Sequence, residues 1–108
     1  MSPPGGPSAA QITVSLAALR ADAAEWEHAA GTLRTASRRA DAAAVPSAAF
    51  SFAGGPVERA YELLRVGTAG LLAAGAQEFD TIAAALRAAA DTYEADELRH
   101  LHRLRNIY

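Results

Sequence analysis

Apolar and small residues recur every three or four positions along two long stretches of this chain. In the first stretch the spacing alternates between four and three without interruption, which is the heptad spacing of a coiled-coil seam. The seam positions are Ile12, Leu16, Leu19, Ala23, Trp26, Ala30, Leu33, Ser37, Ala40 and Ala44. The charged residues of this stretch all lie off the seam. The pattern therefore predicts a helix over residues 9–44 that buries one narrow face.

Local signals mark both ends of this first helix. Ser8, followed three residues later by Gln11, is typical of a capping box, in which each side chain accepts a hydrogen bond from the other residue's backbone N–H. Pro46 disfavours helical geometry at the residue before it, so the helix should end near residue 44. Residues 1–7 are rich in proline and glycine and should form a disordered arm.

The second stretch predicts a helix over residues 56–104, after a turn at 45–55. Pro56 suits the first position of a helix, where its missing N–H costs nothing. The expected seam positions are Tyr61, Leu64, Thr68, Leu72, Gly75, Phe79, Ile82, Leu86, Ala89 and Tyr93. Two successive spacings of four, at Leu64, Thr68 and Leu72, indicate one stutter that should locally straighten the supercoil.

Together these patterns predict an all-α fold, an antiparallel two-helix hairpin. Aromatic residues make up only 6% of the chain, so two helices rich in alanine can bury only a thin core. Leu63, Val66 and Leu71 lie off the seam and widen the apolar face of the second helix. We expect these three residues to form a partner interface, through which two hairpins pair into a four-helix bundle.

Charge and cysteine content exclude several classes of function. The net charge of −2 argues against nucleic-acid binding, and the basic tail at Arg99, Arg103 and Arg105 is too small to change that expectation. The absence of cysteine excludes disulfides, thiolate nucleophiles and cysteine-based zinc sites. No constellation of residues resembles a catalytic site. We therefore expect no enzyme activity and no cofactor.

No stretch approaches the roughly 18 continuous apolar residues of a membrane span, so we expect no membrane insertion. The N-terminal residues contain neither a basic segment nor an apolar one, so they do not resemble a cleaved signal peptide. Export, if it occurs, would need a route that does not depend on such a signal.

One metal-binding alternative comes from two Glu-x-x-His segments, at Glu25–His28 and Glu97–His100. This spacing supplies di-iron ligands in helical bundles when further glutamates project inward. Glu25 and His28 flank Trp26, which occupies the seam, so these two side chains should point sideways rather than into a core. A di-iron-type bundle is therefore a remote alternative.

Tyr93 and Glu97 lie one helical turn apart near the end of the second helix. An aromatic ring and a carboxylate on one face can serve as a compact recognition motif. Alternatively, Tyr93 simply closes the seam and Glu97 is solvated.

The segment Leu86-Arg-Ala-Ala-Ala-Asp-Thr-Tyr93-Glu-Ala-Asp-Glu97, within a helical hairpin with a glycine-marked turn, resembles the EspC-like secretion-associated proteins of actinobacteria. These are relatives of the WXG (ESAT-like) substrates of the type VII, or ESX, secretion system. The resemblance runs from about Ile12 to Glu97. The Trp-x-Gly of the WXG relatives is absent, and Phe52-Ala53-Gly54 takes its place in the turn.

This resemblance implies a dimeric hairpin that is exported without a cleaved signal, with Tyr93 and Glu97 as its secretion signal. The expected partners are a second copy or a related hairpin, and the ATPase or a chaperone of the secretion machinery. The protein would be cytoplasmic before export, then secreted or associated with the cell envelope. The alternative is an intracellular coiled-coil adaptor or structural protein, in which Tyr93 is ordinary seam packing.

Overall fold

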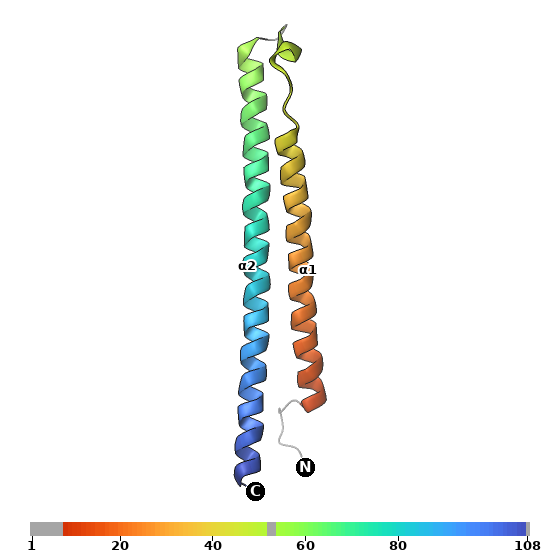
Figure 1. Ribbon diagram of the computed structural model, residues 1–108, viewed down its shortest axis with the longest axis vertical. Coiled ribbons are helices and arrows are strands. Elements are labelled where there is room, and N and C mark those ends of the chain that lie inside the picture. Colours follow the sequence, from red (N-terminus) through yellow and green to blue (C-terminus); the bar gives the residue numbers. More distant parts are fainter. Residues whose placement is uncertain (1–7, 52–53, 108) are drawn as a thin grey trace. The chain divides into compact units, whose positions relative to one another are not determined.

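The computed structural model describes residues 8–51 and 54–107, apart from the side chain of the last of these (Figure 1). Helix α1 spans Ala9–Ala42, a short 3-10 helix η1 spans Ser47–Phe50, and helix α2 spans Gly55–Ile107. The two long helices pack antiparallel, so the predicted all-α helical hairpin is confirmed. The predicted disordered arm and Phe52 of the predicted turn motif lie outside the described residues.

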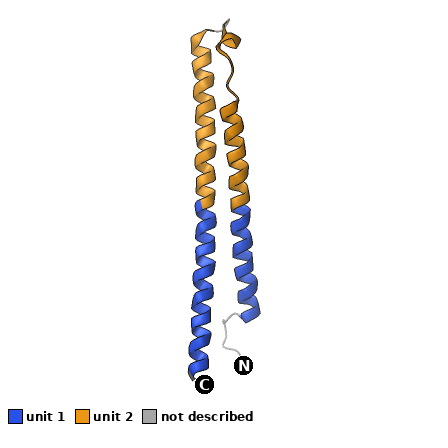
Figure 2. Cartoon of the chain, viewed as in Figure 1, with its two compact units in different colours: residues 1–26, 81–108 blue, residues 27–80 orange. Residues whose placement is uncertain are grey.

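The hairpin divides into two compact units, which are coloured separately in Figure 2. Unit 1 combines residues 1–26 with residues 81–108, so that the first part of α1 packs against the last part of α2. Unit 2 comprises residues 27–80 and contains the rest of both helices together with η1.

The start of α1 is capped as the sequence predicts. The Ser8 N–H donates to Gln11 Oε1 at 2.7 Å, and the Gln11 N–H donates to Ser8 Oγ at 3.1 Å. These two bonds satisfy backbone donors that have no partner within the helix itself. The capping box is therefore confirmed.

The connection between the helices contains a helical turn that the sequence pattern did not predict. Helix α1 ends at Ala42, two residues before the predicted end, and Pro46 directly precedes η1. Gly54 has a φ of 79°, a left-handed backbone conformation that residues with a Cβ rarely adopt. Its N–H donates to the carbonyl of Phe50 at 2.9 Å, which closes the turn directly before α2. Gly54 of the predicted turn motif thus has a structural role.

The predicted seam of α1 is confirmed from Ile12 to Ala40, where every position is buried or half-buried. Its most buried members are spaced by seven residues, at Leu16, Ala23 and Ala30. Trp26 is half-buried rather than fully buried, so its ring does not form the centre of a closed core.

The predicted seam of α2 is wrong at Leu64, Thr68 and Ala89, which are exposed, and its last position, Tyr93, is also exposed. Its buried residues are instead alanines spaced by seven, accompanied by half-buried large residues three positions later. The buried column consists of Ala69, Ala76, Ala83 and Ala90, and the half-buried column of Leu72, Phe79 and Leu86. Leu64 is 69% exposed and Thr68 is also exposed. The heptad repeat therefore continues without the predicted stutter.

The buried alanines allow the two helices to approach closely. In unit 2 the Ser37 hydroxyl of α1 donates to the backbone carbonyl of Ala69 at 2.7 Å. A seven-residue step along each helix from this contact brings Ala30 level with Ala76, and both are completely buried. At Gly75, an added Cβ would lie 3.4 Å from Leu33 Cδ1. The interior of this unit is thus a layer of small side chains edged by larger ones.

Both units have the same register. In unit 1 Arg20 forms an ion pair with Glu94, and in unit 2 Arg34 forms one with Asp80. The two arginines are two heptads apart on α1, and the two carboxylates are two heptads apart on α2.

Candidate functional site

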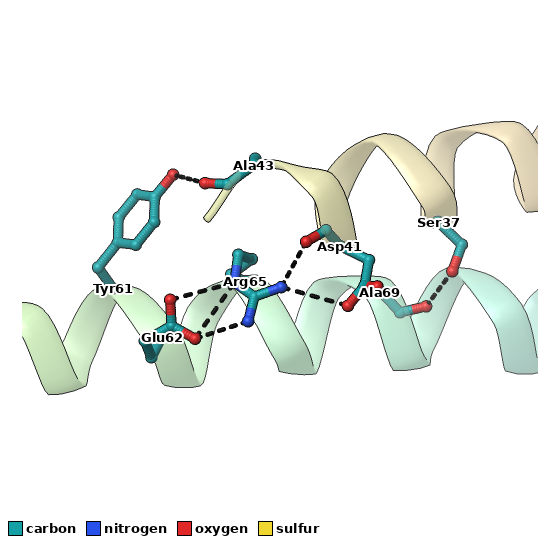
Figure 3. Close-up of polar contacts among 7 residues, drawn as sticks. All are labelled: Ser37, Asp41, Ala43, Tyr61, Glu62, Arg65 and Ala69. Atoms are coloured by element: carbon teal, nitrogen blue, oxygen red, sulfur yellow. Dashed lines mark hydrogen bonds and ion pairs between the residues drawn. The ribbon is translucent and has the colours of Figure 1, made fainter. Parts of the chain in front are cut away.

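In unit 2, polar side chains of α2 donate hydrogen bonds to backbone carbonyls at the end of α1 (Figure 3). The Tyr61 hydroxyl donates to the Ala43 carbonyl at 2.6 Å, and Arg65 donates to both the backbone carbonyl and the carboxylate of Asp41. Glu62 accepts hydrogen bonds from Arg65 one turn along the same helix. The last carbonyls of a helix lack partners within it, so these contacts act as a C-terminal cap supplied by the opposite helix.

The hydrogen bonds to Arg65 lower the pKa of the Glu62 carboxyl, because they stabilise its charged form. The same bonds raise the pKa of Arg65, whose side chain is only 15% exposed. Arg65 stands seven residues before Leu72, so it occupies a seam position that is apolar further along α2. This cluster therefore links the end of α1 to α2 within unit 2.

The predicted secretion-signal residues lie in unit 1, where they continue the two seam columns of α2. Tyr93 stands seven residues after Leu86 in the column of large side chains, and Glu97 stands seven after Ala90 in the alanine column. Tyr93 is nevertheless 42% exposed, whereas Glu97 is half-buried. Tyr93 thus shares the register of a seam residue without being enclosed like one.

Glu97 lines an apolar groove between the first turns of α1 and the last turns of α2. The groove is lined mainly by aliphatic side chains, with two carboxylates at its edge: Ala9, Ile12, Thr13, Leu16, Glu94, Glu97, Leu98 and Leu101. A surface of this kind suits an aliphatic side chain that is accompanied by a positive charge.

The carboxylates near Tyr93 differ in their partners. Arg20 of α1 pairs with Asp91 at 2.9 Å and with Glu94 at 3.1 Å, and these bonds raise the pKa of its guanidinium. Within the described part of the chain, Glu97 takes part in no ion pair. Glu97 is therefore the carboxylate of this region that is available to a partner.

A second candidate surface is the apolar face of α2 in unit 2. The predicted interface residues Leu63, Val66 and Leu71 are 76%, 55% and 75% exposed. Leu64 and Val57 extend the exposed surface, which the sequence-based prediction missed. The uncharged stretch between Arg65 and Glu78 is a sequence signal for Val66 and Leu71 only, because Val57 and Leu64 each stand next to a charged residue.

Glycines lie within this apolar face. At Gly67 and Gly70 an added Cβ would meet no atom within 4 Å apart from the adjacent residues and backbone of its own helix, so neither glycine is required by packing inside the hairpin. Both are exposed, and a shallow hollow beside Gly67 is lined by Leu63 and Val66. Exposed glycines on the surface of a helix allow the backbone of another helix to approach closely.

Within the described residues, no three histidine or carboxylate side chains lie close enough together to hold a metal ion. The Glu-x-x-His segments are thus not assembled into a ligand set in this chain. Nor does any helix of residues 8–51 and 54–107 have the length and apolarity needed to cross a membrane.

Comparisons with protein-family models, with curated proteins and with solved structures found no match to this chain.

Proposed function

We propose that this chain is a substrate, or a secretion-associated component, of a type VII secretion system and acts by protein–protein recognition. Tyr93 and Glu97 form the secretion signal, which the ATPase or a chaperone of the machinery binds. The protein is cytoplasmic before export and is then secreted or associated with the cell envelope.

The exposure of Tyr93 is the observation that carries this proposal. Leu72, Phe79 and Leu86, which occupy the same column of α2, are half-buried, whereas Tyr93 is 42% exposed. An exposed ring beside an unpaired carboxylate one turn away provides both an apolar contact and a charge to a binding partner. A tyrosine whose only role was packing would be expected to be as covered as its predecessors.

The apolar face of α2 supports the proposal that the chain binds a partner hairpin, either a second copy or a related protein. Leu63, Leu64 and Leu71 each expose more than two thirds of their surface, and the intervening glycines leave room for a second helix. Contiguous exposed apolar surface of this kind marks interaction sites in soluble proteins. Pairing through this face would complete a four-helix bundle.

An intracellular coiled-coil adaptor is the alternative function. The apolar face of α2 supports it equally well, because pairing of hairpins does not require export. The two functions differ in the role of Tyr93 and Glu97. The secretion substrate needs both residues for export, whereas the adaptor needs them at most for folding and for pairing with another hairpin.

Export from the native host distinguishes them. Tagged wild type, Tyr93→Phe, Tyr93→Ala and Glu97→Ala would be compared in culture filtrate and lysate, with Thr92→Ala as an exposed neighbour outside the motif. We expect Tyr93→Ala and Glu97→Ala to lose export at equal intracellular levels, while Thr92→Ala is exported like the wild type. A wild-type protein that never leaves the cell would overturn the secretion proposal in favour of the adaptor.

A further inference from the structure

The last turns of α2 expose a row of leucines. Leu98 is 61%, Leu101 is 47% and Leu104 is 39% exposed. Leu98 and Leu101 line one side of the groove whose other side is formed by Ile12 and Leu16, so the first turns of α1 cover them only in part. These leucines therefore retain surface that a further helix could cover.

Charged residues flank this row symmetrically. Leu98 and Leu104 each stand three residues from Leu101, whereas Glu97 and Arg105 each stand four residues from it. At about 100° per residue, all five project within an arc of roughly 120° on α2. We call these five residues the tail face. It carries a negative charge at one end, a positive charge at the other and leucines between them.

The remaining arginines of the tail do not disturb this arrangement. Arg99 and Arg103 project from the opposite side of α2, where both line a separate shallow hollow, and Arg99 forms an ion pair with Asp96. The described residues provide no ion-pair partner for Glu97 or for Arg105. Both ends of the tail face thus carry a charge that remains available.

When the tail face is read in the opposite direction, the leucines keep their positions, and the positions of Glu97 and Arg105 are exchanged. In an antiparallel arrangement of two copies, Leu101 meets Leu101, Leu98 meets Leu104, and Glu97 meets Arg105 twice. We propose that the tail face binds the tail face of a second copy of this chain, about a two-fold axis at Leu101. Such a contact is isologous, as in most closed dimers.

The charges favour a second copy over other occupants. A partner surface of a single charge, including an anionic lipid surface, would attract one end of the tail face and repel the other. A second copy, by contrast, pairs both ends at once and covers the leucines between them. The overlap is short, so the contact is weak and reversible by dilution.

This pairing would also regulate the recognition motif, an inference that rests on the proposed function. Glu97 belongs to both the tail face and the proposed secretion signal, so it cannot serve both partners at the same time. Copies paired through their tails would therefore keep the signal covered until the machinery displaces one of them.

Disulfide trapping tests the contact directly, because the chain contains no cysteine. Leu101→Cys places a thiol on the proposed two-fold axis, where the two Cβ atoms can approach closely enough for a disulfide. His100→Cys is the matched control, since it places a thiol about 100° around the helix from Leu101, outside the arc of the tail face. Under mild oxidation of the purified proteins, we expect the Leu101→Cys dimer to form at least about tenfold faster than the control dimer.

Charge reversal tests the antiparallel register. In the Leu101→Cys background, Glu97→Arg and Arg105→Glu should each slow trapping, because like charges then meet at both ends. An equimolar mixture of the two single reversals should restore the rate, since each charge again meets its opposite. Equal trapping of Leu101→Cys and His100→Cys, or a mixture that stays slow, would overturn the proposal. Neither result depends on export, so the secretion proposal stands or falls separately.

Discussion

The hydroxyl of Ser37 in α1 donates a hydrogen bond of 2.7 Å to the backbone carbonyl of Ala69 in α2. A side chain as short as serine can reach the main chain of a neighbouring helix only where the two helices lie close together. The small side chain at residue 69 leaves that carbonyl accessible. This contact shows how the alanine column determines the spacing of the helices in unit 2.

Enlarging a buried alanine should therefore force the helices apart. Ala76→Leu adds three carbons at a position with no exposed surface, so we expect unfolding free energy to fall by about 1–3 kcal/mol or more. Ala84→Leu, at an exposed position of the same helix, should change it by less than about 0.5 kcal/mol. Urea unfolding followed by circular dichroism measures both. Equal effects at the two positions would show that the alanine column does not control packing.

The cap on the end of α1 can be tested by removing one hydroxyl. Tyr61→Phe deletes the donor to the Ala43 carbonyl and keeps the ring, so we expect a loss of about 0.5–1.5 kcal/mol in unfolding free energy. Tyr93→Phe is the matched control. Its hydroxyl has no hydrogen-bond partner within the described residues, and it should leave stability unchanged. Thermal unfolding of the two variants in parallel compares their stabilities. If Tyr61→Phe leaves the unfolding free energy unchanged, the hydrogen bond to Ala43 does not stabilise the protein.

Stability should also depend on pH through Glu62. Because Arg65 lowers the pKa of this carboxyl in the folded protein, the ionised group stabilises the fold above its ordinary pKa of 4.5. That contribution is lost as the pH falls through the depressed folded-state pKa. We expect the difference in unfolding free energy between wild type and Glu62→Gln to be constant above about pH 5 and to shrink at lower pH. A difference that is independent of pH between 7 and 3 would contradict the assignment.

The apolar face of α2 predicts a separation between pairing and stability. Leu63→Asn and Leu71→Asn alter side chains that are 76% and 75% exposed, so each should change monomer stability by less than about 0.5 kcal/mol. Combined, they should shift the protein from dimer toward monomer in size-exclusion chromatography with light scattering. Ala84→Asn is a control at an exposed position outside this face. A double variant that pairs like the wild type would exclude this face as the interface.

Much of the fold could be predicted from local chemistry. The Ser8–Gln11 capping box and the end of α1 before Pro46 each depend on a few neighbouring residues, so their patterns were sufficient. The seam of α1 was also predictable, because its apolar residues lie mainly on one face.

The candidate sites were predictable only as residue types and spacings. Sequence showed that Tyr93 and Glu97 share a face and that Leu63, Val66 and Leu71 lie off the seam. It did not show the groove between α1 and α2 beside Glu97, because that groove joins segments far apart along the chain. Nor did it show that Arg65, a charged residue, occupies a seam position and satisfies the end of the opposite helix.

Sequence by itself determined the two helices, their antiparallel order and the turn between them. Tertiary structure alone decided which face of α2 turns inward. Leucines occur on both faces of this helix, so the spacing of its apolar residues did not distinguish the face that carries Leu64 from the face that carries Ala69. Close approach to α1 selects the small side chains, since alanines spaced by seven permit a separation that a leucine column would prevent. The leucines on the other side of α2 are consequently left on the surface, where they belong to the apolar face of α2 that we propose as the partner interface.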